Sequence, residues 1–229
     1  MTISSDTQAT PTSEDFIYGL VNEMEELFAK LGELETLESE SEGQVEVNIL
    51  LKLAMTSEFE ASELAAVWMP TTPEVDAKRL LAEQCGEEMK HYEMISHRLE
   101  ELGEDMSTFD PVAQGYSPLH QYLKTLRTTV ERVAAGPFAC EAIARIRNLQ
   151  FIEFCRKAGD YRTAELYETL IQPEEVRHHV RGRNLLIKYC TTPELQAKAE
   201  SAVRNTLAVA DELRTLKEKT TGLAAIPLS

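Results

Sequence analysis

The feature that most constrains the fold of this chain is a five-residue pattern that occurs twice, 87 positions apart. In each copy two glutamates are followed by an apolar residue, a basic residue and a histidine. On a helix, positions i and i+3 project from the same face, so the second glutamate and the histidine of each copy can point at one ligand. Each copy then supplies half of a metal site, and joining the halves requires helices packed side by side. The two copies are Glu87-Glu88-Met89-Lys90-His91 and Glu174-Glu175-Val176-Arg177-His178.

The composition favours a globular helical chain. Of 229 residues, 43% are apolar, which is enough for a core, and only ten Gly and nine Pro occur. The formal net charge of -16 argues against nucleic acid or an anionic membrane surface as a partner. Four cysteines without CxxC spacing predict neither a disulfide framework nor a zinc site. Because neither a secretory signal nor a long apolar run is found, we expect a cytoplasmic protein without a membrane span.

Helical periodicity and helix-stop residues predict one all-α domain over residues 13–220. Residues 1–12 are expected to form a disordered tail, and residues 221–229 an irregular one. The core bundle, about residues 45–190, should contain two helical hairpins joined by a crossover. Gly136-Pro137 should separate or kink the crossover and the helix after it, and Pro173 should break or bend the last core helix. The expected helices are 13–31 before the core, 45–69 and 73–102 in the first hairpin, 118–134 in the crossover, 137–157 and 161–190 in the second hairpin, and 193–219 at the end.

A site for two metal ions needs one more glutamate from each of the two remaining core helices. In the second hairpin, Glu141 lies 18 residues before Gly159 and Glu175 lies 16 after it, so the two should stand at similar heights. In the first hairpin both Glu58 and Glu60 can reach the level of Glu88. The small residues that share the face of Glu58 and the spacing to Glu141 favour Glu58, while Glu60 stays as the alternative.

The resulting pattern of Glu, Glu-x-x-His, Glu and Glu-x-x-His resembles the ferritin-like di-iron carboxylate proteins over about residues 45–190. Glu58-Phe59-Glu60-Ala61 followed by Glu88-Met89-Lys90-His91 is also similar to aldehyde-deformylating oxygenases, which again selects Glu58. The helix spacing is more similar to multicomponent monooxygenase subunits and the ribonucleotide reductase small subunit than to ferritins. The resemblance implies a ferritin-like four-helix bundle with extra terminal helices. It also implies metal ligands at Glu58, Glu88, His91, Glu141, Glu175 and His178, with one glutamate of the Glu-x-x-His motifs bridging the ions.

Carboxylates and imidazoles in this combination suit two iron ions, or manganese, with positions left open for dioxygen. We therefore expect a di-iron oxidase or oxygenase that activates dioxygen to oxidise a small apolar molecule, with an electron-donor protein as a partner. The alternatives are an iron-binding, ferroxidase or iron-storage protein and a dimanganese catalase. The acidic, Ser-rich linker expected at residues 32–44 and the two extra helices, one at each end of the core, favour a monomer or homodimer over a storage shell.

Several residues near the motifs are expected to have other roles. His179 lies about 100 degrees around the helix from His178 and is predicted to be a surface residue or a residue that supports a ligand. Glu87 and Glu174 are expected to face solvent, with an orienting role as the alternative. The cysteines are expected to fill apolar space rather than to react. The competing interpretation of the whole pattern is two Glu/His pairs on solvated helix faces.

Overall fold

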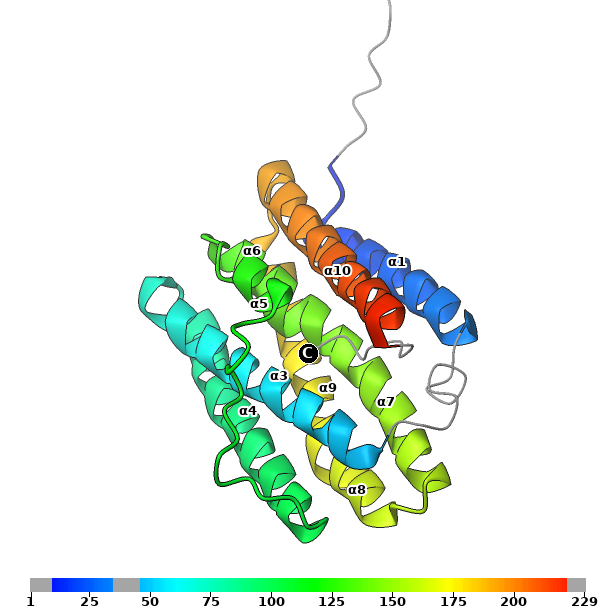
Figure 1. Ribbon diagram of the computed structural model, residues 1–229. Coiled ribbons are helices and arrows are strands. Elements are labelled where there is room, and N and C mark those ends of the chain that lie inside the picture. Colours follow the sequence, from blue (N-terminus) through cyan, green and yellow to red (C-terminus); the bar gives the residue numbers. More distant parts are fainter. Residues whose placement is uncertain (1–9, 35–45, 222–229) are drawn as a thin grey trace, which may run out of the picture.

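The computed structural model describes residues 10–34 and 46–221, and all of its regular structure in these ranges is helical (Figure 1). This agrees with the predicted all-α class. The predicted tails at residues 1–12 and 221–229 lie largely outside the described residues, as does most of the acidic segment at 32–44. No helix within the described part of the chain is long and apolar enough to cross a membrane.

The first hairpin consists of α3 (Val47–Trp68) and α4 (Val75–Glu101), which pack along their lengths. A short 3-10 turn, η1 (Met69–Thr71), and an extended segment that includes Pro73 connect them. The buried side chain of Arg132, at the start of the second hairpin, secures this connection, because it donates hydrogen bonds to Trp68 O at 3.3 Å and Thr72 Oγ1 at 3.0 Å. Both helices agree with the predicted ranges 45–69 and 73–102 to within a few residues.

The crossover differs from the single helix expected at 118–134. The predicted range holds two short helices instead, α5 (Pro118–Leu123) and α6 (Thr129–Val133). A new helix starts at α6 because Thr128 forms a capping box: its Oγ1 accepts from Glu131 N at 3.3 Å, and Glu131 Oε2 accepts from Thr128 N at 2.8 Å. The crossover therefore ends at Thr128, and the helix that follows belongs to the second hairpin.

The second hairpin keeps its helical path through both proline positions. Its first helix runs from α6 through a π-helical segment, η2 (Ala134–Cys140), into α7 (Glu141–Lys157). Its second helix runs from α8 (Tyr161–Leu166) through another π-helical segment, η3 (Tyr167–Ile171), into α9 (Gln172–Tyr189). Pro137 lies inside η2 and Pro173 directly follows η3, so the chain absorbs each proline with a wider helical turn rather than a break.

Two more helices cover one end of the molecule, where α1 (Ser13–Leu34) and α10 (Pro193–Thr221) lie side by side (Figure 1). They add their apolar faces to a core cluster that includes Ile17 and Trp68. A second apolar cluster, which includes Met55, Ile95 and Phe151, fills the other end of the hairpins. The duplicated motifs lie between these clusters, so their polar side chains are enclosed by apolar packing above and below.

Candidate metal centre

All six side chains selected from the sequence are buried and meet in the interior of the bundle. They come from four helices: Glu58 from α3, Glu88 and His91 from α4, Glu141 from the start of α7, and Glu175 and His178 from α9. None is more than 4% exposed. Burying so many ionisable groups without a counter-charge is costly, so a cluster of this kind is suited to holding a cation.

The first half of the cluster surrounds the Nδ1 atom of His91. This atom lies 3.1 Å from Glu88 Oε2, 3.3 Å from Glu175 Oε1 and 3.5 Å from Glu58 Oε2. One ligand atom from each of these four residues lies within 4.8 Å of the others, close enough for a single ion to bind them all. Three helices, α3, α4 and α9, therefore supply every donor of this half.

The second half of the cluster surrounds the Nδ1 atom of His178. Glu88 Oε1 lies 3.2 Å from it, Glu175 Oε2 3.8 Å and Glu141 Oε1 3.9 Å. These four residues also bring their ligand atoms within 4.8 Å of one another. Glu88 and Glu175 therefore belong to both halves, and each directs one oxygen toward each histidine.

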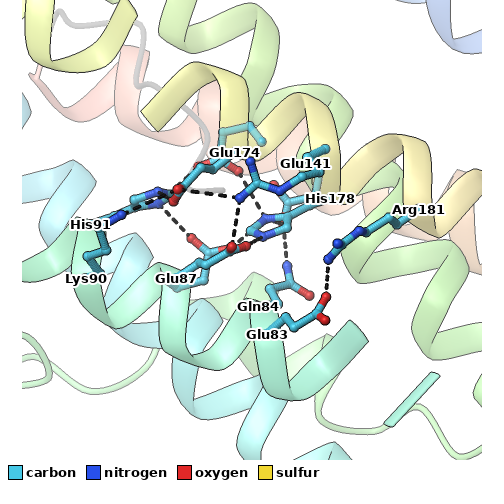
Figure 2. Close-up of polar contacts among 12 residues, drawn as sticks. Glu83, Gln84, Glu87, Lys90, His91, Glu141, Glu174, His178 and Arg181 are labelled. Atoms are coloured by element: carbon cyan, nitrogen blue, oxygen red, sulfur yellow. Dashed lines mark hydrogen bonds and ion pairs between the residues drawn. The ribbon is translucent and has the colours of Figure 1, made fainter. Parts of the chain in front are cut away.

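The outer nitrogens of the two histidines bind the first glutamate of the opposite motif (Figure 2). His91 Nε2 lies 2.9 Å from Glu174 Oε2, and His178 Nε2 lies 2.5 Å from Glu87 Oε2. Each histidine can reach the glutamate of the other motif because α4 and α9, which carry the two motifs, run antiparallel. A carboxylate at Nε2 holds the proton there and leaves the Nδ1 lone pair free for a metal. Glu87 and Glu174 thus do not simply face solvent; they take the orienting position that was the alternative.

Replacing Glu174 by Ala is expected to weaken Fe(II) binding about 10- to 100-fold, because His91 loses the partner that fixes its ring. Glu174→Gln keeps an oxygen that can accept from Nε2 and should lose less. The measurement is a competitive titration of Fe(II) against a chelator. Glu83→Ala is the matched control, because Glu83 also pairs across α4 and α9, with Arg181, but touches neither histidine. Equal losses in Glu174→Ala and Glu83→Ala would contradict the orienting role.

Glu141 enters the cluster through the π-helical segment η2, which ends one residue before it. The side chain of Gln84 donates a hydrogen bond to Glu141 Oε1 (Figure 2). Gln84 lies one helical turn before Glu88 on α4, so it shares a face with the motif. Sequence reasoning missed Gln84, although an i−4 search from Glu88 finds it.

The alternative glutamate on α3 serves a different purpose. Both oxygens of Glu60 bind the start of the crossover: Oε1 accepts from Ser117 N at 2.6 Å, and Oε2 accepts from Ser117 Oγ at 2.5 Å. Ser117 in turn caps α5 by accepting from His120 N at 3.1 Å. Glu60 is therefore engaged outside the cluster, and Glu58 is the α3 glutamate that the fold places inside it.

His179 lies outside the cluster, but it is not on the surface. The residue is only 7% exposed, and its ring stacks on Phe138 with ring centroids 5.0 Å apart and places Nδ1 2.8 Å from Phe138 O. Burial lowers the pKa of His179 to about 4, so the ring is neutral at pH 7. The predicted surface position is thus wrong, and His179 packs α9 against η2. Cys85, Cys140, Cys155 and Cys190 are unpaired, and all but Cys85 are buried.

The pKa values of Glu58, Glu141 and His178 are shifted toward the protonated forms. Burial raises the pKa of Glu58 and of Glu141 well above the ordinary value for a carboxyl group. Burial of the ring lowers the pKa of His178, but contacts with Glu175 and Glu88 outweigh burial and raise this pKa to about 11. Four carboxylates in one dry space thus attract positive charge strongly. A divalent cation bound here would supply that positive charge and displace protons.

A scan of protein-family models, a search of curated proteins and a search of solved structures each gave no match to this chain. The assignment of a function therefore depends on the residues and geometry of the cluster.

Proposed function

We propose that this chain is a ferritin-like di-iron protein, and that it activates dioxygen to oxidise a small organic substrate. The observation that carries the proposal is the pair of overlapping buried groups, Glu58-Glu88-His91-Glu175 and Glu88-Glu141-Glu175-His178. Each group offers three carboxylates and one imidazole, and the two shared glutamates join them. This is the donor set of the ferritin-like di-iron carboxylate proteins that the sequence resembles.

The buried atoms of the cluster fit metal ions. One oxygen each of Glu58, Glu88, Glu141 and Glu175, together with His178 Nδ1, has no hydrogen-bond partner among the described residues. Buried polar atoms without partners are rare in folded proteins and call for a missing ligand. Carboxylate oxygens with imidazole nitrogen suit iron and manganese in the +2 and +3 states.

A pair of iron ions, when bound, supplies the electrons and the open positions that dioxygen chemistry needs. The residues of this chain bind and orient. The four glutamates supply the negative charge, Glu87 and Glu174 hold the two imidazoles, and the apolar clusters on either side exclude water. An enclosed, dry site protects reactive oxygen species from side reactions, which favours oxidation of an organic substrate.

The test combines metal analysis with oxygen uptake. Protein loaded with Fe(II) under argon and desalted is expected to retain about two iron ions per chain, one for each group. It should consume dioxygen on exposure to air faster than free Fe(II) at the same concentration. The double variant Glu88→Gln/Glu175→Gln is the control and should do neither. Protein that binds no metal would overturn the proposal.

The same preparation separates the other functions. A large hollow assembly by light scattering, with iron mineral inside, would replace the proposal with iron storage. Rapid peroxide disproportionation by manganese-loaded protein, and none with iron, would replace it with a dimanganese catalase.

A further inference from the structure

The two halves of the cluster correspond closely, but one neighbouring position differs between them. Each half has a histidine, two shared glutamates, one glutamate of its own and an orienting carboxylate at the outer nitrogen. In the first motif, Gln84 lies four residues before Glu88. In the second, Ile171 lies four residues before Glu175. An amide that can donate hydrogen bonds thus lies one helical turn from the first motif, and a hydrocarbon side chain lies one turn from the second.

The amide of Gln84 binds the carboxylate of Glu141. Gln84 Nε2 donates to Glu141 Oε1, and the two residues are only 5% and 3% exposed (Figure 2). The same oxygen lies 3.9 Å from His178 Nδ1, and Glu141 Oε2 has no hydrogen-bond partner among the described residues. A hydrogen bond to a buried carboxylate favours its charged form and fixes its direction. Glu141 is therefore held by a residue outside the cluster.

Glu58, the corresponding glutamate of the other half, has no such support. Its Oε2 lies 3.5 Å from His91 Nδ1, and no residue outside the cluster donates a hydrogen bond to Glu58 within the described part of the chain. Ile171 is fully buried and has no donor in its side chain. Burial and the charge of Glu58 raise the pKa of Tyr167, but the Tyr167 hydroxyl bonds to no described residue. The carboxylate of Glu141 is thus held in place, and that of Glu58 is not.

We propose that Gln84 is a positioning residue of the metal centre, and that it makes the half around His178 bind its ion more tightly than the half around His91. A ligand whose direction is already fixed loses less freedom when an ion binds, and supporting partners of this kind change metal affinity about 10- to 100-fold. When iron is limiting, the chain should therefore hold one ion, in the half around His178. This inference rests on the metal binding of the proposed function, and it adds an order in which the two positions fill.

The experiment titrates metal-free protein with Fe(II) under argon against a competing chelator. Two binding steps are expected, with dissociation constants that differ at least about tenfold. Gln84→Leu removes the donor and fills the space with hydrocarbon, so it should weaken the tighter step at least about tenfold and leave the other step unchanged. Ile171→Leu is the matched control at the corresponding position. It neither adds nor removes a polar group, and both steps should stay as they are in the parent.

Two background variants show which half Gln84 supports. Glu58→Gln leaves only the half around His178 able to bind an ion, and in this background Gln84→Leu should weaken Fe(II) binding at least about tenfold. Glu141→Gln leaves only the half around His91, and in this background Gln84→Leu should have no effect. A general loss of structure would weaken binding in both backgrounds. The comparison therefore separates an action through Glu141 from damage to the fold.

The outcomes separate this inference from the proposed function. Two ions bound with equal affinity, or equal effects of Gln84→Leu in the two backgrounds, overturn the role of Gln84 and leave the proposed function intact if the protein consumes dioxygen. Two unequal steps that depend on Gln84, without dioxygen uptake, support the inference, and only the proposed oxidation fails. Parent protein that binds no iron overturns both.

Discussion

Changing Glu88 to Gln is expected to remove both metal ions from the protein, whereas changing Glu58 to Gln should remove only one. Glu88 contributes to both groups of the cluster, with Oε2 near His91 and Oε1 near His178, while Glu58 belongs to the first group alone. By the same reasoning, Glu175→Gln should remove both ions and Glu141→Gln one. The measurement is iron per chain after loading with Fe(II) under argon and desalting.

Glutamine is the appropriate replacement because it keeps the shape of the side chain and removes its charge. Removing a charge from a crowded buried cluster does not destabilise the metal-free fold in the way that a cavity does. Glu60→Gln is the matched control, since Glu60 is also buried on α3 but bonds to Ser117. It should retain both ions. Equal iron content in Glu88→Gln and Glu58→Gln would contradict the shared positions of Glu88 and Glu175.

The motifs were predictable because their information is local. Glu-x-x-His places two side chains on one helix face whatever the rest of the fold does, and the 87-residue repeat showed that two such faces exist. The height of Glu141 followed from counting residues to the turn at Gly159. The structure brings these residues together with Glu58, while their role as metal ligands stays a prediction.

The choice between Glu58 and Glu60 was not settled by local information. The two lie about 200 degrees apart on α3, so packing decides which one faces the interior of the cluster. In this fold Ser117, which is 57 residues away in sequence, takes both oxygens of Glu60. A contact across that distance depends on where the crossover lies, and helical periodicity gives no information about that position.

Local sequence information was also insufficient to predict the contacts of Glu87 and Glu174 and the path of the helices at the two prolines. Glu87 and Glu174 look exposed on their own helices, and they meet histidines only because the motifs lie antiparallel. Pro137 and Pro173 correctly marked irregular positions. Periodicity could not show that π-helical turns would accommodate them, because that depends on the helices packed around η2 and η3.

Changing Gly182 to Ala is expected to destabilise the protein by about 1–3 kcal/mol, the cost of forcing extra atoms into a packed core. A Cβ atom at Gly182 would lie 2.7 Å from Pro137 C, 2.8 Å from Pro137 O and 3.0 Å from Phe138 N. These are backbone atoms of η2, which cannot turn aside as a flexible side chain can. Either α9 or η2 must shift, and Glu141 follows η2 directly. The variant should therefore also bind Fe(II) more weakly.

Gly86→Ala, on the neighbouring helix α4, is expected to change stability in the opposite direction. Gly86 is exposed in the interior of α4, and no atom lies within 4 Å of a Cβ built there. Alanine in a helix interior is favoured over glycine by about 0.5–1 kcal/mol, so this variant should be more stable than the parent. Urea unfolding of both metal-free variants measures the two changes. A Gly182→Ala protein as stable as the parent would show that α9 and η2 do not approach as closely as the structure places them. Loss of stability in Gly182→Ala, with a gain in Gly86→Ala, would tie the position of Glu141 to the backbone contact between these two helices.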